Sequence, residues 1–357
     1  MICLFLTSIL YCQPALHMNL KEHLSKEQTT NSRLLTSLVK KKMINFAAEK
    51  VKTMRLIKWI DRLTGRTHDS KRVALGLGGG GARGLAHIGA IEELLQRGYV
   101  IHSIAGTSIG AIVGGFYASG QLEDLKQKFD QLSRRDIMSL IDLSLGLDHV
   151  ASGDKLEELM EEMFEGEKIE DLPISFRCCA SDLVSGHEKV FSKGPLARAI
   201  RASISIPGFF RPVNIDGAAY VDGSVHNVLP LNRVEREKGD LLVGVNVSGP
   251  DEKPNADYMT KNDKTTSLVQ AIMAHIPLLR SQFSENYVNL GLRVARISIQ
   301  NASRMAVQLT PPDVYAEVAM DRFGLFDYSQ NKEIIDYGRK IMAEALDKYE
   351  NRNRDKT

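Results

Sequence analysis

The stretch VALGLGGGGARG, residues 73–84, decides the fold. Its first five residues form a short apolar run that is typical of a buried strand, and four consecutive glycines follow this run. Beyond the glycines, Ile88, Ile91 and Leu95 share one face of a helix, and Gly98 marks the C-terminal end of that helix. A buried strand, a glycine loop and a helix together are typical of the first half of a βαβ unit.

The same order of elements repeats at residues 101–119. An apolar strand at residues 101–105 leads into GTSIG, residues 106–110, and a helix of small residues follows. The remaining chain predicts further strands at residues 175–180, 213–221, 241–247 and 293–297, and further helices at residues 154–164, 195–202, 265–290 and 332–349. We therefore expect an α/β fold, a three-layer sandwich with a mostly parallel central sheet.

Three regions are predicted along the chain: a basic N-terminal extension at residues 1–72, the α/β domain at residues 73–350 and a polar tail at residues 351–357. Of the 357 residues, 43% are hydrophobic, and 46 Lys and Arg stand against 44 Asp and Glu. This ordinary composition excludes the disordered, collagen-like and disulfide-rich classes. No apolar run reaches the roughly 20 residues of a membrane-spanning helix, which argues against a multi-pass membrane protein.

The charge is unevenly distributed. Residues 18–72 hold 14 Lys and Arg against 5 Asp and Glu, whereas residues 73–357 hold 32 against 39. We expect the basic segment to be either a helical arm that binds anionic lipid head groups or a solvated extension. Nucleic-acid binding is not expected, because the body is acidic and no recognition motif is present.

The first residues give only a weak targeting signal. The apolar stretch at residues 2–11 is too short to span a bilayer, and no basic residue precedes it as in a signal peptide. We expect Met18, Met43 and Met54 as candidates for the true start. The expected location is the cytoplasm, with peripheral contact at the inner face of the membrane.

The glycine loop admits three interpretations. Gly76, Gly78 and Gly81 match the spacing of a dinucleotide fingerprint, but that fingerprint needs an acidic residue about 20 positions later, and residues 100–119 contain none. A phosphate-binding Walker loop also fails, since no Gly-Lys-Ser or Gly-Lys-Thr follows. In the register Gly79-x-Gly81-x-x-Gly84, bare backbone amides at a helix N-terminus can instead bind an oxyanion. No nucleotide cofactor and no metal are expected.

A candidate nucleophile lies in the second glycine motif. Ser108 is flanked by Gly106 and Gly110 between a predicted strand and a predicted helix, the context in which such a pentapeptide forms a sharp turn that exposes the serine hydroxyl.

The serine needs a base, and the residues leave the choice open. A Ser-His-Asp triad would use a downstream histidine, but none has a distinctive motif among His149, His187, His226 and His275. Two Asp-Gly pairs offer an aspartate instead. Asp216 looks like part of a hairpin turn, whereas Asp222 ends a strand at the sheet edge where sites collect.

Taken together, these motifs resemble the patatin-like phospholipase family. The resemblance rests on residues 79–84, 106–110, 202–210 and 220–223, in the family's order. It implies that Ser108 is the nucleophile and Asp222 its base in a catalytic dyad, that the oxyanion hole is formed by Gly79, Gly80, Gly81 and Arg83, and that the turns are supported by Gly84, Gly106, Gly110 and Gly223. Ser224 departs from the Gly or Ala expected after Asp-Gly. Asp216-Gly217-Ala218 keeps that triplet, so Asp216 is the residue to test against Asp222.

The resemblance also implies an activity. It is typical of a cofactor-free lipid acyl-hydrolase, a phospholipase, lysophospholipase or carboxylesterase that forms an acyl-enzyme, with a phospholipid or another acyl ester as substrate. Two alternatives stay open: an acyltransferase that passes the acyl group to an alcohol or carrier, and a non-catalytic regulator that binds lipid.

Overall fold

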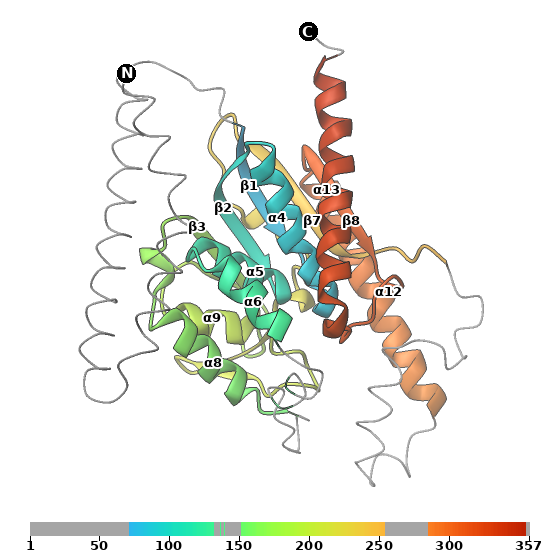
Figure 1. Ribbon diagram of the computed structural model, residues 1–357. Coiled ribbons are helices and arrows are strands. Elements are labelled where there is room, and N and C mark those ends of the chain that lie inside the picture. The colour runs from blue at the N-terminus through green and yellow to red at the C-terminus, as the bar shows by residue number, and fades with distance from the viewer. Residues whose placement is uncertain (1–70, 132–135, 137–138, 140–150, 254–284, 355–357) are drawn as a thin grey trace, which may run out of the picture. The chain divides into compact units, whose positions relative to one another are not determined.

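One sheet organises the computed structural model, which describes residues 71–131, 136, 139, 151–253 and 285–354 (Figure 1). Within these residues the sheet has eight strands in the order β5-β6-β3-β2-β1-β7-β8, and β4 pairs with β3 outside this path. The strands are β1 Arg72–Leu77, β2 Val100–Thr107, β3 Ser175–Asp182, β4 Glu188–Phe191, β5 Val213–Ile215, β6 Ala218–Asp222, β7 Leu241–Gly249 and β8 Val314–Ala319.

Five of these strands are parallel. β3, β2, β1, β7 and β8 run in one direction, whereas β4 and β6 pair antiparallel with β3, and β5 pairs antiparallel with β6. The expected mostly parallel sheet is therefore confirmed. The helices between and after the strands are α4 Ala86–Gln96, α5 Ile109–Ala118, α6 Leu122–Gln131, α8 Asp154–Phe164, α9 Leu196–Ser203, α12 Glu285–Leu309 and α13 Asn331–Arg354, with short 3₁₀ helices η1 Gly81–Leu85, η2 Ile169–Asp171, η3 Gly223–Val225, η4 Leu231–Arg233 and η5 Tyr328–Gln330.

Helices cover both faces of the sheet. Successive strand residues point to opposite faces, so each central strand has apolar side chains on both faces that need to be buried. In β1, Val73, Leu75 and Leu77 join the large core formed with α4, α5, α9 and α13, whereas Ala74 joins a smaller core on the other face. The smaller core is completed by residues 228–234 and by α12 side chains such as Ile299. The three-layer sandwich expected from the sequence is the observed fold.

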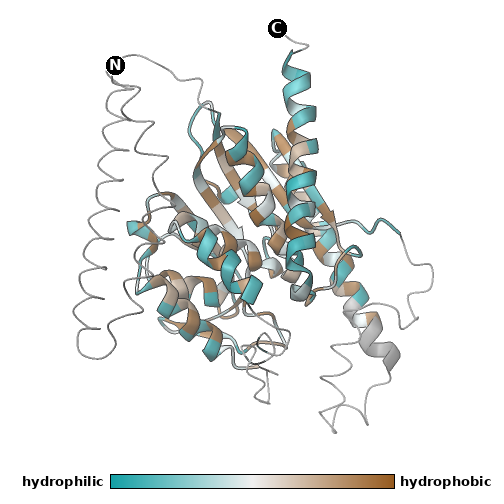
Figure 2. Cartoon of the chain, in the orientation of Figure 1, coloured by the Kyte–Doolittle hydropathy of each residue, from teal (hydrophilic) through white to brown (hydrophobic). Residues whose placement is uncertain are grey.

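The hydropathy pattern agrees with these layers. The strands in the middle of the fold are mostly apolar, whereas α6 and the C-terminal end of α13 are polar (Figure 2). No helix in the described part of the chain is long and apolar enough to cross a membrane. Residues 18–70 of the basic segment at residues 18–72 lie outside the described residues. Residues 265–284 of the helix expected at residues 265–290 also lie outside them, and its last residues, 285–290, belong to α12.

One predicted strand is wrong. Residues 293–297 belong to the 25-residue helix α12, not to a strand. Their five-residue window holds too little sequence to separate a strand from a helix, whereas Ile299, Ala302 and Ala306 continue the helical spacing and pack against the sheet. Two strands were also not predicted: the four-residue β4, and β8, the last strand in the order, whose residues alternate in burial.

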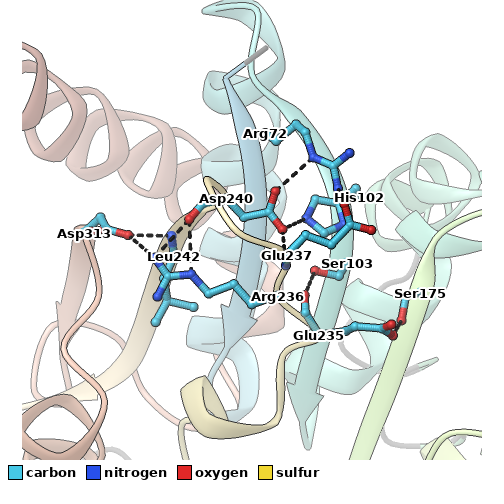
Figure 3. A network of polar contacts seen from close by, with 10 residues as sticks. All are labelled: Arg72, His102, Ser103, Ser175, Glu235, Arg236, Glu237, Asp240, Leu242 and Asp313. Carbon is cyan, nitrogen blue, oxygen red and sulfur yellow. Dashed lines mark hydrogen bonds and ion pairs between the residues drawn. The ribbon is translucent and has the colours of Figure 1, made fainter. Parts of the chain in front are cut away.

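The N-terminal ends of the parallel strands are joined by a polar network (Figure 3). The buried Asp240 carboxylate, just before β7, accepts hydrogen bonds from Arg72 Nε at 2.9 Å and from the Glu237 amide at 2.6 Å. His102 of β2 lies 2.6 Å from the same carboxylate. This network ties β1, β2 and β7 together at the edge opposite to the C-terminal edge, where β2 meets the candidate site.

Candidate active site

Ser108 lies on a sharp turn between β2 and α5. Its backbone φ of 55° and ψ of −124° is a conformation that residues other than glycine rarely adopt, and such strain gathers at functional sites. The turn closes only because its neighbours lack side chains. A Cβ atom on Gly110 would clash with the Leu77 carbonyl, and one on Gly106 would clash with the Gly110 carbonyl. The predicted supporting role of both glycines therefore has a steric basis.

Asp222 lies at the C-terminal end of β6, beside this turn. β3 brings the two together: its residue Cys179 pairs with Thr107 of β2, and its next residue, Ala180, pairs with Asp222. Gly223 follows close to β3, where a Cβ atom would clash with the Cys179 carbonyl. The Ser108 side chain lies beside the Asp222 carboxyl group and lowers the pKa of that group.

The pair is largely withdrawn from solvent. Ser108 is 7% exposed and Asp222 is 3% exposed. Burial raises the pKa of the Asp222 carboxyl group, because a low-dielectric surrounding disfavours its charged form, and hydrogen bonds from Ser108 and Ser224 oppose this effect only in part. The pKa of Asp222 is therefore raised above its ordinary value, which makes this carboxylate a stronger base than an exposed aspartate.

The C-terminal end of α9 and the residues that follow it hold both members of the pair. The Ser203 hydroxyl accepts a hydrogen bond from the Ser108 amide at 2.9 Å and donates one to the Cys179 carbonyl at 2.6 Å. Two residues later, the Ser205 carbonyl accepts a hydrogen bond from the Asp222 amide at 2.9 Å. Residues 202–210 carry part of the family resemblance, but no local signal in the sequence predicts this role of Ser203.

The glycine loop lies against the serine. A Cβ atom on Gly79 would be 3.3 Å from Ser108 Cβ. The Gly79 amide donates to the Val228 carbonyl at 2.9 Å, so it is already occupied as a hydrogen-bond donor. The described residues supply no acceptor for the amides of Gly80 and Gly81. Gly81 has a φ of 61°, which favours glycine there.

Arg83 is buried beneath the loop and not on a helix surface. It is 2% exposed, and its guanidinium donates to the carbonyls of Val247 at 2.8 Å and Phe323 at 3.1 Å. These bonds connect the loop to β7 and to the segment after β8. Gly84 lets this part of the chain approach the helix after the serine, because a Cβ atom there would clash with Ile109.

His87 is a loop contact that the sequence analysis missed. It is fully buried at the start of α4, and its Nε2 donates to the Gly78 carbonyl at 2.8 Å. Burial lowers the pKa of this imidazole to about 4, although the hydrogen bond to Gly78 raises it somewhat. The ring is therefore neutral at pH 7 and supports the glycine loop as a hydrogen-bond donor. Its signal in the sequence is only a polar residue on the apolar side of a helix.

The alternative bases lie elsewhere. His226 is exposed and its Nε2 contacts the Gly186 carbonyl at 3.0 Å, and His187 is exposed in the same turn region. His149 and His275 lie outside the described residues. Asp216 is exposed in the turn between β5 and β6, with a φ of 50°. Within the described ranges, no group of three or more His, Cys, Asp and Glu side chains is arranged to hold a metal ion.

A serine on a strained strand-to-helix turn, next to a buried carboxyl group and a glycine loop, defines an α/β protein of the nucleophile-elbow class. Residues 75–234 match the family model for the patatin-like phospholipases. The resemblance to this family seen in the sequence is therefore confirmed over these residues.

Relatives of known sequence agree with this family. An uncharacterised NTE family protein of Mycobacterium tuberculosis is 38% identical over 222 residues, which cover 60% of this chain and 62% of that protein. Lysophospholipase NTE1 of Saccharomyces cerevisiae is 26% identical over 343 residues, 90% of this chain and 20% of that protein. The chain thus spans less than two thirds of these relatives. Among solved structures, VipD from Legionella pneumophila aligns with a TM-score of 0.47 and 15% identity over 79% of this chain and 67% of that one.

Proposed function

We propose that the protein hydrolyses acyl esters of lipids, with Ser108 as nucleophile and Asp222 as its general base. The observation that carries this proposal is the pairing register of β3, which places the strained Ser108 turn beside the buried Asp222 carboxyl group. The family match and the yeast relative's name, lysophospholipase, support a lipid ester as the substrate. A phospholipid or lysophospholipid is the substrate class that we infer.

The proposed reaction has two halves. Ser108 Oγ attacks the ester carbonyl carbon while its proton passes to the Asp222 carboxylate. The tetrahedral intermediate then collapses, the leaving alcohol takes that proton, and an acyl-enzyme remains on Ser108. In the second half, Asp222 accepts a proton from water, the resulting nucleophile attacks the acyl-enzyme, and Ser108 Oγ regains a proton as the fatty acid leaves.

The negative charge that develops on the carbonyl oxygen needs donors nearby. We assign this role to the amides of Gly80 and Gly81, because the Gly79 amide already donates to Val228. Loss of one such donor typically costs about 10²–10³ in rate. Arg83 contributes by holding the loop through its bonds to Val247 and Phe323.

The test is activity against a short-chain nitrophenyl ester and a lysophospholipid, together with labelling by a fluorophosphonate probe. Ser108→Ala should lose both hydrolysis and labelling, and Asp222→Asn should lose hydrolysis by about 10³-fold or more. Asp216→Asn is the matched control, an aspartate before glycine in the neighbouring exposed turn, and should remain active. If Asp216→Asn is dead while Asp222→Asn hydrolyses the ester, the base has been assigned to the wrong residue.

Water and alcohol can compete for the acyl-enzyme. Adding glycerol or another alcohol acceptor to the assay separates a hydrolase, which releases free fatty acid, from an acyltransferase, which forms a new ester. Binding of lipid with no turnover by the wild-type protein would favour a non-catalytic regulator.

We also propose a peripheral contact with the inner face of the membrane through the basic segment at residues 18–72, most of which lies outside the described residues. The measurement is sedimentation with anionic liposomes in low and high salt, since attraction between exposed charges and head groups is screened by salt. Removal of residues 1–53 should weaken binding in low salt and leave hydrolysis of a soluble ester intact. Equal binding by the shortened and complete chains would remove this contact.

A further inference from the structure

Ser224 makes unusually close contact with the candidate base. Its backbone amide donates to Asp222 Oδ1 at 2.8 Å, and its side-chain hydroxyl lies beside the same carboxyl group and lowers its pKa. The Ser108 side chain is the third group beside this carboxyl group in the described structure. Two of these three groups belong to Ser224, the second residue of η3.

The Ser224 hydroxyl also reaches the glycine loop. A Cβ atom built on Gly79 would clash with Ser224 Oγ, and the same Cβ atom would lie 3.3 Å from Ser108 Cβ. The hydroxyl therefore occupies the space that the missing side chain of Gly79 leaves open. The position of Gly79 is therefore close to both Ser224 Oγ and Ser108 Cβ.

We propose that Ser224 is a positioning residue of the Ser108–Asp222 pair, whose hydroxyl fixes the orientation in which the carboxylate accepts the Ser108 proton. This proposal rests on the proposed function and extends it to a residue outside the dyad. The carboxyl group of Asp222 can rotate about its terminal bond, and the backbone amide of Ser224, with its hydroxyl beside the same group, restricts that rotation. Holding reacting groups within hydrogen-bond reach is worth orders of magnitude in rate.

The other groups around Asp222 cannot take over this role. The Ser205 carbonyl and the Ser181 hydroxyl contact the Asp222 backbone, at 2.9 and 3.0 Å, and not its carboxyl group. Burial, together with the nearby charge of Asp222, raises the pKa of the Cys178 thiol on β3 to about 12. That thiol is neutral at pH 7 and adds no charge beside the carboxylate. The side-chain hydroxyls beside the carboxylate are those of Ser224 and Ser108.

The first test is the pH profile of kcat/KM for Ser224→Ala and Ser224→Thr. A hydroxyl that donates to the carboxylate stabilises its charged form. Removal of the hydroxyl should therefore raise the Asp222 pKa and shift the acid limb of the profile, the fall of kcat/KM at low pH, to higher pH. We expect Ser224→Ala to lose about tenfold in kcat/KM on the acid limb and about threefold on the plateau, and Ser224→Thr, which keeps the hydroxyl, to restore the wild-type profile. A residue with a merely structural role would lower activity equally at all pH values.

The second test is a double-mutant cycle with Gly79→Ala. The new methyl group meets Ser224 Oγ in the wild-type background, but that contact is absent in the Ser224→Ala background. Gly79→Ala should therefore cost about tenfold more kcat/KM in the wild-type protein than in the Ser224→Ala protein, a coupling typical of residues in contact.

The two proposals fail in different ways. If the wild-type protein hydrolyses no ester, or if Ser108→Ala remains active, the proposed function is wrong. If hydrolysis depends on Ser108 and Asp222 but Ser224→Ala keeps the wild-type acid limb, the positioning role of Ser224 is wrong. An equal effect of Gly79→Ala in both backgrounds would contradict the placement of the hydroxyl against the loop.

Discussion

Thr107 and Asp222 pair with consecutive residues of one strand, Cys179 and Ala180 of β3. β4 pairs with residues 178–181 along one side of β3, so β2 and β6 must share the other side. β2 ends where β6 ends, with the two strands running toward each other along β3. The residue after Thr107 is Ser108, and this arrangement therefore places the serine beside the carboxyl group through backbone hydrogen bonds.

The raised pKa of Asp222 has a consequence for activity. A base must be deprotonated to accept a proton, so kcat/KM should fall as pH drops through the Asp222 pKa. Because burial raises that pKa, we expect the acid limb to lie above the ordinary aspartate value of 3.8. The measurement is the pH dependence of kcat/KM with a soluble ester. An acid limb of kcat/KM at or below pH 3.8 would contradict a base whose pKa is raised by burial.

The same shift has a consequence for stability. A carboxyl group whose pKa is raised in the folded protein favours folding while it is protonated, and this contribution is lost as the pH rises through the folded pKa. Asp222→Asn removes the buried charge and keeps an acceptor for Ser224 and Ser108. At pH 7 the substitution should therefore increase the free energy of unfolding by about 1 kcal/mol, which raises the melting temperature by a few degrees.

The control for this second prediction is the exposed Asp216→Asn, which should leave the melting temperature unchanged. The gain from Asp222→Asn should also vanish below about pH 3.8, where the wild-type carboxyl group is protonated as well. A lower melting temperature for Asp222→Asn at pH 7 would show that hydrogen bonding to the charged form outweighs the cost of burial.

Ser203 is the side chain that holds the strained turn. Ser203→Ala leaves the Ser108 amide and the Cys179 carbonyl without this hydroxyl in a fully buried position. We expect a loss of about 1–3 kcal/mol in the free energy of unfolding and about 10- to 100-fold in kcat. Chemical denaturation and ester hydrolysis measure the two effects.

Ser205→Ala is a matched control on the same segment. The Ser205 hydroxyl is also buried, but it contacts Arg201, and its carbonyl, which the substitution keeps, holds Asp222. It should lose stability with a smaller loss of kcat. Equal kcat losses in the two variants would mean that Ser203 acts only through general packing.

The central strands could be predicted because their signal is local. Residues 73–77 and 101–105 are continuous apolar runs before glycine motifs, and a parallel sheet buried on both faces produces such runs. The edge elements carry weaker signals: β4 has only four residues, and residues 293–297 match a strand in a short window although they belong to α12. Edge strands and long amphipathic helices are defined by what packs beside them, which a local pattern does not contain.

The candidate site also combines features that a local motif predicts with features that it does not. The strained turn at Ser108 and the two Asp-Gly pairs were visible as motifs, but the choice between Asp216 and Asp222 depends on the pairing register of β3. The sequence also gave no sign that the Gly79 amide is taken by Val228. Hydrogen bonds between segments far apart in the chain decide which motif residues meet, and single motifs do not encode them.

Asp240 provides a test of the network at the opposite edge of the sheet (Figure 3). Burial alone would raise the pKa of this carboxyl group, but hydrogen bonds from the Glu237 amide and Arg72, together with charge from His102, lower it overall. A lowered folded pKa means that the ionised group stabilises the protein above the ordinary aspartate pKa, and that this contribution is lost as the pH falls through the folded value. Asp240→Asn should therefore lose about 1–3 kcal/mol of unfolding free energy at pH 7.

Glu237→Gln separates the buried carboxylate from the surface charge. Glu237 pairs with the same Arg72 at 2.7 Å but keeps 70% of its side-chain surface exposed, and exposed ion pairs contribute little. Urea unfolding should show a change of less than about 0.5 kcal/mol for this variant at pH 7. The loss caused by Asp240→Asn should shrink as the pH is lowered below 3.8, because the wild-type carboxyl group then becomes protonated too. A loss that is constant from pH 7 to pH 3 would show that the shape of Asp240, and not its charge, holds the three strand ends together.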